Sequence, residues 1–245
     1  MRDWGGHQTG RKLGDREQLY AVANPRHGQG HHVVEISDRG FIRQSGEHSL
    51  AERSIYDYFP WEDRRDATTC PLLHTIATRL KQWAAGNTQR WQRCTIVFGL
   101  EDHAWNDELS LQRYELLWEA GLVPESSWQN GAHLPGLSMH RDYRRILATA
   151  LSRMRAKIRY TPVVFDLLPR QFTLLQLQQA MEALAGRAMH KQNFRRLVQQ
   201  QKLVSRTAEY DSPPQGRPAQ LYQFSPETAE HCYLAGAKLP LPAIS

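Results

Sequence analysis

The chain has 245 residues, of which 40% are hydrophobic and 23% charged, an ordinary balance for a globular protein that buries one large core or two modest ones. No apolar run approaches the roughly 20 residues that a membrane span needs. Residues 1–18 mix charges of both signs without the apolar segment of a secretory signal, so we expect a disordered leader. Composition therefore excludes a membrane-embedded protein.

The three cysteines, Cys70, Cys94 and Cys232, are far apart in the sequence. Their spacing fits neither a disulfide framework nor a zinc site. We therefore expect a cytoplasmic protein in a reducing compartment.

The net charge of +6 is unevenly distributed along the chain. Residues 141–225 hold 15 Lys/Arg against 5 Asp/Glu, whereas the other residues hold 16 against 20. This asymmetry is typical of a polyanion-binding module joined to a neutral or acidic domain. Charge alone leaves open the alternative of a solvated basic helix that binds nothing.

The N-terminal part begins with runs that favour strands. Residues 19–24 and 33–36 are rich in β-branched and aromatic side chains, and a turn at 38–40 leads to a further strand at 41–42. The loop over 25–32 holds three histidines, but no acidic or cysteine partner has metal-ligand spacing, so we predict a polar loop. No glycine-rich phosphate loop occurs in the chain.

Residues 55–66 place four aromatic side chains on irregular backbone beside Arg64 and Arg65. Aromatic faces next to arginines can hold a nucleotide base and its phosphates. The alternative, that Phe59 and Trp61 anchor the loop in the core, is favoured.

Apolar residues spaced by three and four predict helices over 70–85, 106–121 and 140–160. The continuous apolar run over 94–100 predicts a buried strand, and 163–165 predicts a short one. Strands alternating with helices over residues 19–140 indicate an α/β or α+β domain of ordinary size. In the helix over 140–160 we expect an apolar inner face of Ile146, Ala150, Leu151 and Met154, with the charge carried by Arg141, Arg144, Arg145, Arg153 and Arg155.

Residues 172–224 have the outline of a winged helix-turn-helix. Thr173 caps a helix that ends at Gly186, and a second helix over 191–202 buries Phe194, Leu197 and Val198. A basic hairpin closed by Gly-Arg-Pro follows. The other face of the second helix carries only groups that can contact phosphates or base edges, which favours DNA binding.

With motifs such as Tyr160-Thr161-Pro162 and His190 to Arg196, the stretch 140–224 resembles the Nudix-related transcriptional regulators of NAD metabolism. In these regulators an N-terminal Nudix-like effector domain precedes a winged helix. The runs LHTIATRLKQWA, WNDELSLQRYELLWEAGLV and LLQLQQAMEALAG look like the branch that represses de novo NAD synthesis. The resemblance implies that Lys191, Asn193, Arg195 and Arg196 enter the major groove and Arg217 lies in the wing. The matching residues are His140-Arg141, Ile146-Leu147, Lys157, Tyr160-Thr161-Pro162, Phe165, Leu168-Pro169, Phe172-Thr173-Leu174, Leu177-Gln178, His190 to Arg196, Gly216 to Ala219 and Leu221-Tyr222.

The N-terminal half departs from the Nudix hydrolases at their magnesium-binding signature. Aligning Gly121 with its last glycine leaves Glu115 and Glu119 on glutamate positions, while Tyr114 and Trp118 replace an arginine and a glutamate. Binding a hard cation on a pyrophosphate needs clustered carboxylates, and two cannot supply them. We predict no hydrolase activity, no catalytic residue and no metal site.

The sequence thus predicts an α+β protein with a Nudix-like α/β/α N-terminal domain and a C-terminal winged helix. The predicted division is a leader at 1–18, a Nudix-like effector-sensing domain at 19–160, a winged helix at 161–230 and a tail at 231–245. We predict DNA contacts by Lys191, Gln192, Asn193, Arg195, Arg196, Arg206 and Arg217, and effector contacts by Trp61, Arg64, Arg65 and His140.

The expected function is a ligand-responsive repressor of NAD biosynthesis genes, a homodimer that reads a palindromic operator in double-stranded DNA. It requires no cofactor and senses a nucleotide-type ligand such as ADP-ribose, NAD or an ATP-like molecule. The alternatives are a divergent Nudix hydrolase acting on ADP-ribose or a related nucleoside diphosphate, and a winged helix that contacts RNA or protein. The sequence leaves open which ligand is sensed and whether it promotes or releases DNA binding.

Overall fold

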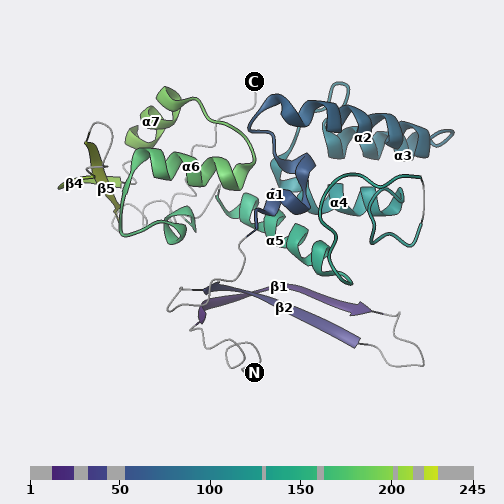
Figure 1. The fold of residues 1–245 in the computed structure, drawn as a ribbon, viewed down its shortest axis with the longest axis horizontal. Coiled ribbons are helices and arrows are strands. Elements are labelled where there is room, and N and C mark those ends of the chain that lie inside the picture. Colours follow the sequence, from purple (N-terminus) through teal and green to yellow (C-terminus); the bar gives the residue numbers. More distant parts are fainter. Residues whose placement is uncertain are drawn as a thin grey trace.

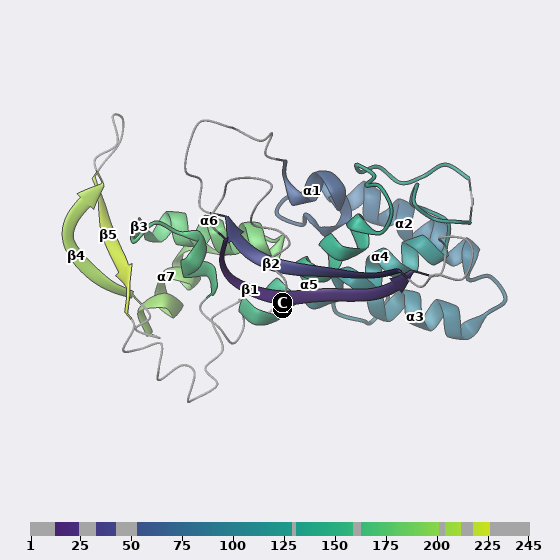
Figure 2. The same cartoon turned by 90° about the horizontal axis from the view of Figure 1, so that it is seen from below.

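The computed structural model describes residues 13–24, 33–42, 53–128, 131–158, 163–200, 204–211 and 218–225. It contains a helical unit, residues 53–158, and a winged helix, residues 163–225, which lie side by side (Figure 1). A β-hairpin formed by the first described residues runs along one side of both (Figure 2). The predicted α+β class is confirmed.

The hairpin pairs β1, Leu13–Asn24, with β2, Val33–Ile42, in antiparallel fashion from Asn24↔Val33 to Leu13↔Ile42, and the register shifts between Gln18 and Tyr20 and between Leu13 and Arg16. One prediction about this region is wrong, because β2 is a single strand through the predicted turn at 38–40. β1 begins at Leu13, within the residues predicted as a leader. Cross-strand pairing supplies backbone hydrogen-bond partners that a local sequence pattern does not reveal. The histidine-containing loop at 25–32 lies outside the described residues.

The helical unit consists of short helices packed against one long one. Among its described residues it contains α1 Ile55–Tyr58, η1 Pro60–Glu62, η2 Ala67–Thr69, α2 Cys70–Trp83, α3 Thr88–Phe98, η3 Asp107–Leu109, α4 Ser110–Glu119 and α5 Tyr143–Ile158. The predicted helices over 70–85, 106–121 and 140–160 are confirmed, with the middle one opening as a 3-10 turn.

The predicted strand over 94–100 is wrong, because residues 94–98 form the end of α3 and Gly99 and Leu100 follow the helix. The Asn87 side chain caps the start of α3 by accepting the Arg90 N–H at 3.0 Å, and Gly99 ends it in the left-handed conformation (φ +58°). Cys94, Val97 and Phe98 face the core. A short apolar run cannot by itself distinguish a buried strand from a buried helix end.

The core of the helical unit is built around aromatic rings. Phe59 packs edge-on against Trp61 and Tyr114, with ring centroids 6.0 and 6.1 Å apart. Phe59 and Trp61 are almost completely buried, which confirms the favoured alternative that they anchor the core.

The predicted inner face of α5 is partly wrong. Leu151 is buried, but Ile146 and Ala150 are only partly so, whereas Arg144 and Arg155 are 1% and 2% exposed. Their guanidinium groups are tolerated in the core because each meets a buried or nearly buried carboxylate.

The winged helix has the predicted order, with two differences. Residues 163–167 form the 3-10 turn η4, Val163–Leu167, instead of a strand, and β3, Gln171–Thr173, adds a third strand to the hairpin. The sheet order is β3-β5-β4. The other elements are α6 Leu174–Ala185, α7 Lys191–Gln200, β4 Val204–Asp211 and β5 Ala219–Phe224.

Thr173 begins α6 as predicted, in a capping box with Gln176. The Thr173 hydroxyl accepts the Gln176 N–H at 3.2 Å, and the Thr173 N–H donates to Gln176 Oε1 at 2.7 Å. Phe172, Leu177 and Phe194 are each 1% exposed and form the centre of the winged-helix core.

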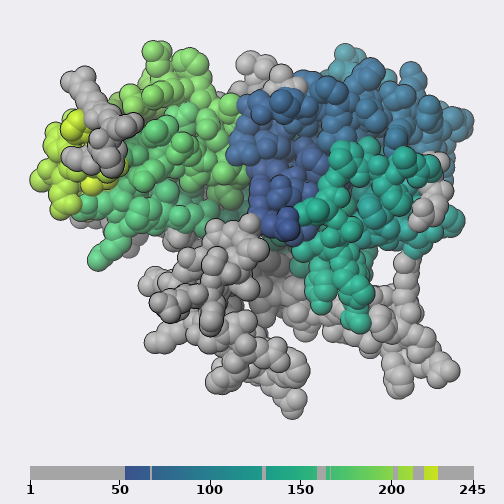
Figure 3. Space-filling view, in the orientation of Figure 1, coloured from purple at the N-terminus to yellow at the C-terminus, as the bar shows by residue number. Residues whose placement is uncertain are grey.

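α5 connects the two parts of the molecule. Ala148 and Leu151 belong to the core of the helical unit, while Ile158 belongs to that of the winged helix. The surfaces of the two parts meet in the space-filling view (Figure 3). None of the helices in the described ranges is long and apolar enough to cross a membrane. The predicted domain limits stay a prediction.

Candidate DNA-binding surface and the contacts behind it

Helix α7 separates apolar from polar side chains sharply. Phe194 and Val198 are buried at 1% and 3% exposure, and Leu197 is partly buried. The polar side chains of the other face are all exposed. They are Lys191, Gln192, Asn193, Arg195, Arg196 and Gln199. The structure therefore leaves the five predicted DNA-binding residues of α7 open to a partner.

The turn between α6 and α7 is fixed by a small hydrogen-bond network. Gly186 ends α6 with φ +72°. Gln178 Nε2 donates to Glu182 Oε1 at 2.9 Å and to the Met189 carbonyl at 3.0 Å. Glu182 Oε1 also accepts the Met189 N–H at 2.8 Å. Two side chains of α6 thus hold the backbone just before α7, which sets where α7 begins.

The wing is held by the same kind of contact. Thr207 Oγ1 donates to the Leu221 carbonyl at 3.0 Å, and Gln220 Nε2 donates to the Thr207 carbonyl at 2.8 Å. Arg206 on β4 is exposed opposite Tyr222 of β5. Arg217 lies outside the described residues. The described part of the wing therefore offers Arg206 as a further exposed cationic group.

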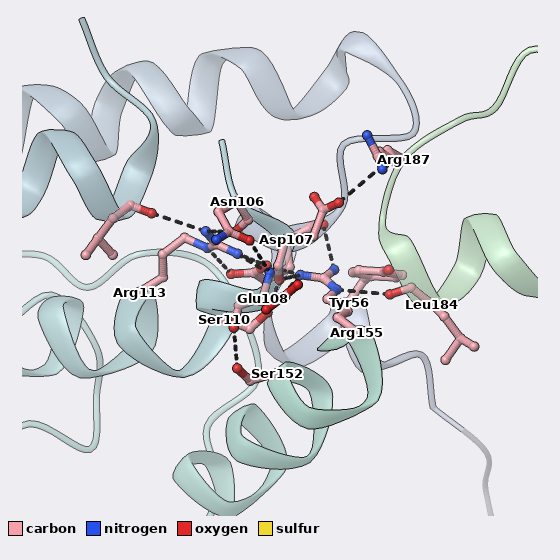
Figure 4. A network of polar contacts seen from close by, with 12 residues as sticks. Tyr56, Asn106, Asp107, Glu108, Ser110, Arg113, Ser152, Arg155, Leu184 and Arg187 are labelled. Carbon is pink, nitrogen blue, oxygen red and sulfur yellow. Dashed lines mark hydrogen bonds and ion pairs between the residues drawn. The ribbon is translucent and has the colours of Figure 1, made fainter. Parts of the chain in front are cut away.

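The helical unit contains a buried ion network centred on Glu62. Its members Ser110, Arg113 and Arg155 are labelled in Figure 4. The Glu62 carboxylate accepts Arg113 Nε at 2.5 Å and Arg113 Nη2 at 2.9 Å, and it also forms an ion pair with Arg155. Ser110 Oγ lies between them, 3.2 Å from Glu62 and 2.8 Å from Arg155 Nη1. All three ionised side chains have at most 1% of their surface exposed.

The electrostatics of this network hold Glu62 ionised. Burial acts to raise the pKa of Glu62, but the guanidinium groups of Arg113 and Arg155 outweigh burial and lower that pKa below its ordinary value. For Arg155, burial acts to lower the pKa, and the Glu62 carboxylate raises it above its ordinary value. The charges of Glu62 and Arg155 therefore depend on each other.

The network continues into the winged helix. Arg155 Nε donates to the Leu184 carbonyl at 2.9 Å, and Arg187 Nε lies 3.3 Å from the Asp107 carboxylate (Figure 4). Two further contacts, from residues before and after Glu62, reach the end of α6 and the turn that follows it. The Tyr56 hydroxyl donates to the Ala183 carbonyl at 2.6 Å, and the Arg64 N–H donates to the Gly186 carbonyl at 2.6 Å.

A second buried arginine stabilises the other end of α5. Arg144 Nη1 lies 3.2 Å from Glu125, and its guanidinium group donates to the Tyr58 carbonyl. The guanidinium carbon is 5.5 Å from the Phe59 ring centroid and 5.2 Å from that of Trp61. Burial lowers the pKa of Arg144, although Glu125 acts to raise it. The role of Arg144 is structural.

The predicted effector residues occupy different environments. Trp61 is completely buried in the core, and its role as an effector contact stays a prediction. The exposed Arg64 stacks 4.5 Å from the Trp105 ring centroid, and Arg65 pairs with Asp63 at 2.7 Å. His140 is exposed on the loop before α5.

A cavity of about 360 Å³ lies at another place in the helical unit. Its described lining consists of Arg79, Gln82, Trp83, Leu122, Gly131 and Ala132. The Arg79 guanidinium group already donates to the Ala132 carbonyl. The four predicted effector residues do not line it.

The two glutamates that align with the Nudix signature are each paired with a different arginine. Glu115 lies 2.8 Å from Arg145, and Glu119 lies 2.6 Å from Arg93. Within the described residues, no group of three or more His, Cys, Asp or Glu side chains could hold a metal ion. Each glutamate thus already has a cationic partner.

Comparison with known proteins bears on the C-terminal part. Residues 164–224 match the family model described as the NrtR DNA-binding winged helix domain. These residues form a winged helix of the NrtR type. The predicted resemblance to Nudix-related regulators of NAD metabolism is thereby confirmed through this domain, and α7 lies within the matched residues.

Among curated proteins, the chain is 33% identical over 100 residues to the ADPR responsive transcriptional repressor NtrR of Acinetobacter baylyi. The match covers 41% of this chain and 40% of that repressor, so the similarity spans about two fifths of the relative's length.

Two solved structures are also similar. The crystal structure of Shewanella oneidensis NrtR complexed with a 27mer DNA has 33% identity and a TM-score of 0.34, covering 38% of this chain and 42% of that chain. The crystal structure of Shewanella oneidensis NrtR has 18% identity and a TM-score of 0.40, covering 91% of this chain and 68% of that chain. Because both TM-scores are below 0.5, the fold is assigned from the element order and the family match.

Proposed function

We propose that this protein is a ligand-responsive transcriptional repressor of NAD biosynthesis genes, which binds operator DNA through α7 and the wing. The observation that carries the proposal is the exposed polar and basic face of α7 in a domain that matches the NrtR DNA-binding winged helix. A helix of this kind places its exposed side chains against base edges and phosphates in the major groove. The repressor named in the curated match supports the direction of regulation.

We propose the predicted set as the DNA contacts, and a homodimer on a palindromic operator as the binding species. Two copies of a winged helix related by twofold symmetry read two half-sites, which makes a palindrome the expected target. The set comprises Lys191, Gln192, Asn193, Arg195, Arg196, Arg206 and Arg217.

We propose that the N-terminal part is a Nudix-like sensor of a nucleotide-type ligand and does not hydrolyse it. The name of the Acinetobacter relative, which is ADPR responsive, makes ADP-ribose the first ligand to test. The exposed side chains of Arg64, Arg65 and His140 remain candidates for its phosphates. The arginine partners of Glu115 and Glu119 support the absence of a magnesium site.

The DNA-binding proposal is tested by the double substitution of Arg195 and Arg196 with Ala. Loss of direct contacts costs about 1–3 kcal/mol for each residue that reads a base, and removing a phosphate contact lowers the salt slope of binding by about 1. The control is the double substitution of Arg90 and Arg93 with Ala, which removes the same charge from exposed positions of α3. Duplex DNA selected by the wild-type protein from a random-sequence library is the probe. Equal affinity of the two double variants would contradict the proposal.

The sensor proposal is tested by thermal shift with ADP-ribose, NAD, ATP and nicotinic acid derivatives. A ligand that binds only the folded protein raises the unfolding midpoint by mass action. The same ligand must then change DNA affinity, because it shifts the equilibrium only if the DNA-competent and incompetent forms bind it differently. A ligand that raises the midpoint without changing DNA affinity contradicts the regulatory role.

A further inference from the structure

The C-terminus of α6 is capped by groups from the helical unit. The last four carbonyls of a helix lack partners within the helix and must find them elsewhere. The Glu182 carbonyl accepts the Gly186 N–H at 2.9 Å. The Ala183 and Leu184 carbonyls accept the Tyr56 hydroxyl at 2.6 Å and Arg155 Nε at 2.9 Å.

The cap continues one residue beyond the helix and adds a charge. The Gly186 carbonyl accepts the Arg64 N–H at 2.6 Å. The Arg155 guanidinium group places a cation at the negative end of the α6 dipole, where it is favourable. Arg155 is itself held by Glu62 and Ser110. The cap is thus formed by a firmly positioned side chain, a tyrosine of α1 and a backbone amide.

Gly186 allows this close approach. A Cβ atom added there would lie 2.3 Å from the Glu62 carbonyl oxygen, 2.5 Å from Arg155 Nη2 and 3.0 Å from the Tyr56 hydroxyl. The first of these contacts is with backbone, which cannot rotate away. A side chain at this position would push the turn off the helical unit, so the glycine is required by the contact as well as by its φ of +72°.

The position of this turn is passed on to α7. Gln178 and Glu182 join the last turns of α6 to the Met189 backbone, and Met189 precedes α7 by two residues. Arg187, within the same turn, pairs with Asp107 of the helical unit. A shift of the capping groups therefore moves the start of α7 with it.

We propose that the helical unit sets the position of the recognition helix α7 by capping the C-terminus of α6, with the Tyr56 hydroxyl, the Arg155 side chain and the Arg64 amide as positioning groups. The inference rests on the proposed function and adds to it the route by which the sensor reaches the DNA. Arg64 and Arg65 lie on the segment that supplies one of the capping groups, so a phosphate bound there acts on the cap directly.

The experiment uses the full chain with two variants and two matched controls. Tyr56→Phe removes one capping hydrogen bond, and Tyr143→Phe removes an exposed tyrosine hydroxyl at the start of α5. In Gly186→Ala, the alanine is strained in the left-handed conformation, and its Cβ also clashes with the Glu62 carbonyl oxygen. Gly86→Ala has the same kind of strain (φ +78°) with nothing within 4 Å of the new Cβ.

Two readouts are measured for each protein: affinity for duplex DNA selected by the wild type from a random-sequence library, and hydrogen exchange of the amides over 183–190. Since the proposal makes the capped turn the form that binds DNA, Tyr56→Phe loses a hydrogen bond in that form only. The variant is therefore expected to bind DNA more weakly, by at most about tenfold. Gly186→Ala is expected to weaken DNA binding further, and both are expected to speed exchange in the turn. Both controls are expected to behave as wild type.

Unchanged DNA affinity in Tyr56→Phe and Gly186→Ala overturns the positioning role, whatever happens to exchange. Unchanged exchange over 183–190 overturns the cap itself. If the wild-type protein selects no DNA from the library, the proposed function fails and the positioning role fails with it. In that case, faster exchange over 183–190 in Tyr56→Phe and Gly186→Ala, but not in the two controls, still supports the cap as a structural feature.

Discussion

Replacing Glu62 with Gln removes the only carboxylate that the described structure places against Arg113 and Arg155 at the centre of the buried network. The side chain keeps its volume but loses its charge, which leaves two guanidinium groups buried without a counter-charge. Breaking a buried ion pair from one side costs about 3–5 kcal/mol. Because domains are stable by about 5–15 kcal/mol, the variant is expected to lose a large part of its stability.

The assay is urea unfolding followed by circular dichroism, with tryptophan fluorescence as a second probe because Trp61 and Trp105 lie in the same core. The matched control is Glu119→Gln, which also removes one carboxylate from an arginine. Glu119 and Arg93 have 40% and 47% of their side-chain surface exposed. Exposed pairs contribute about 0–1 kcal/mol, so the control is expected to unfold nearly as the wild type does.

The same substitution changes the response to acid. The pKa of Glu62 is lowered in the folded protein, so its contribution to stability is fully present above the ordinary carboxyl value of 4.5 and is lost as the pH falls toward the folded value. Wild type is therefore expected to lose stability below about pH 4.5, and Glu62→Gln to lose less over that window. A Glu62→Gln variant as stable as Glu119→Gln, with the acid response of the wild type, would refute the reasoning.

Three further outcomes follow from the described contacts. Thr173→Ala removes the N-cap of α6 and is expected to lower the free energy of unfolding by about 1 kcal/mol, measured by thermal unfolding. The comparison is Thr78→Ala, at an exposed position of α2. Phe194→Ala empties the centre of the winged-helix core and is expected to cost about 3–5 kcal/mol and to weaken DNA binding. A smaller loss in urea unfolding would mean that the core collapses around the gap. Burial raises the pKa of the Cys94 thiol to about 11, whereas Cys70 is exposed. Iodoacetamide at mildly alkaline pH is therefore expected to label Cys70 before Cys94, which peptide mass spectrometry can measure. Equal labelling of the two cysteines would contradict the burial of Cys94.

Local sequence signals predict the two helices of the winged helix, α6 and α7. The Thr173 cap, the Gly186 end and the stripe of Phe194 and Val198 are each set by contacts within a few residues, and the structure confirms them. The exposed face of α7 follows from the same periodicity. The identity of what this face contacts rests on residue chemistry and on the family match, which agree.

The buried face of α5 differs from the face predicted from the sequence because two of its members are arginines. Arg144, Ala148, Leu151, Arg155 and Ile158 follow one another at helical spacing and are all buried. The spacing was visible in the sequence, but the partners were not. Glu62 lies 93 residues before Arg155, and Glu125 lies 19 before Arg144.

Capping, helix termination and periodicity act over a few residues, so the amino-acid sequence is enough to predict a capped two-helix module with a basic outer face. The burial of Trp61, the burial of Arg155 and the groups that cap the end of α6 depend on contacts between distant parts of the chain. Each of these depends on a charge or a backbone group that meets its partner across the fold. The physical reason is that a buried ion or an unpaired carbonyl is stable only beside its partner, and sequence distance does not limit which residue that partner is.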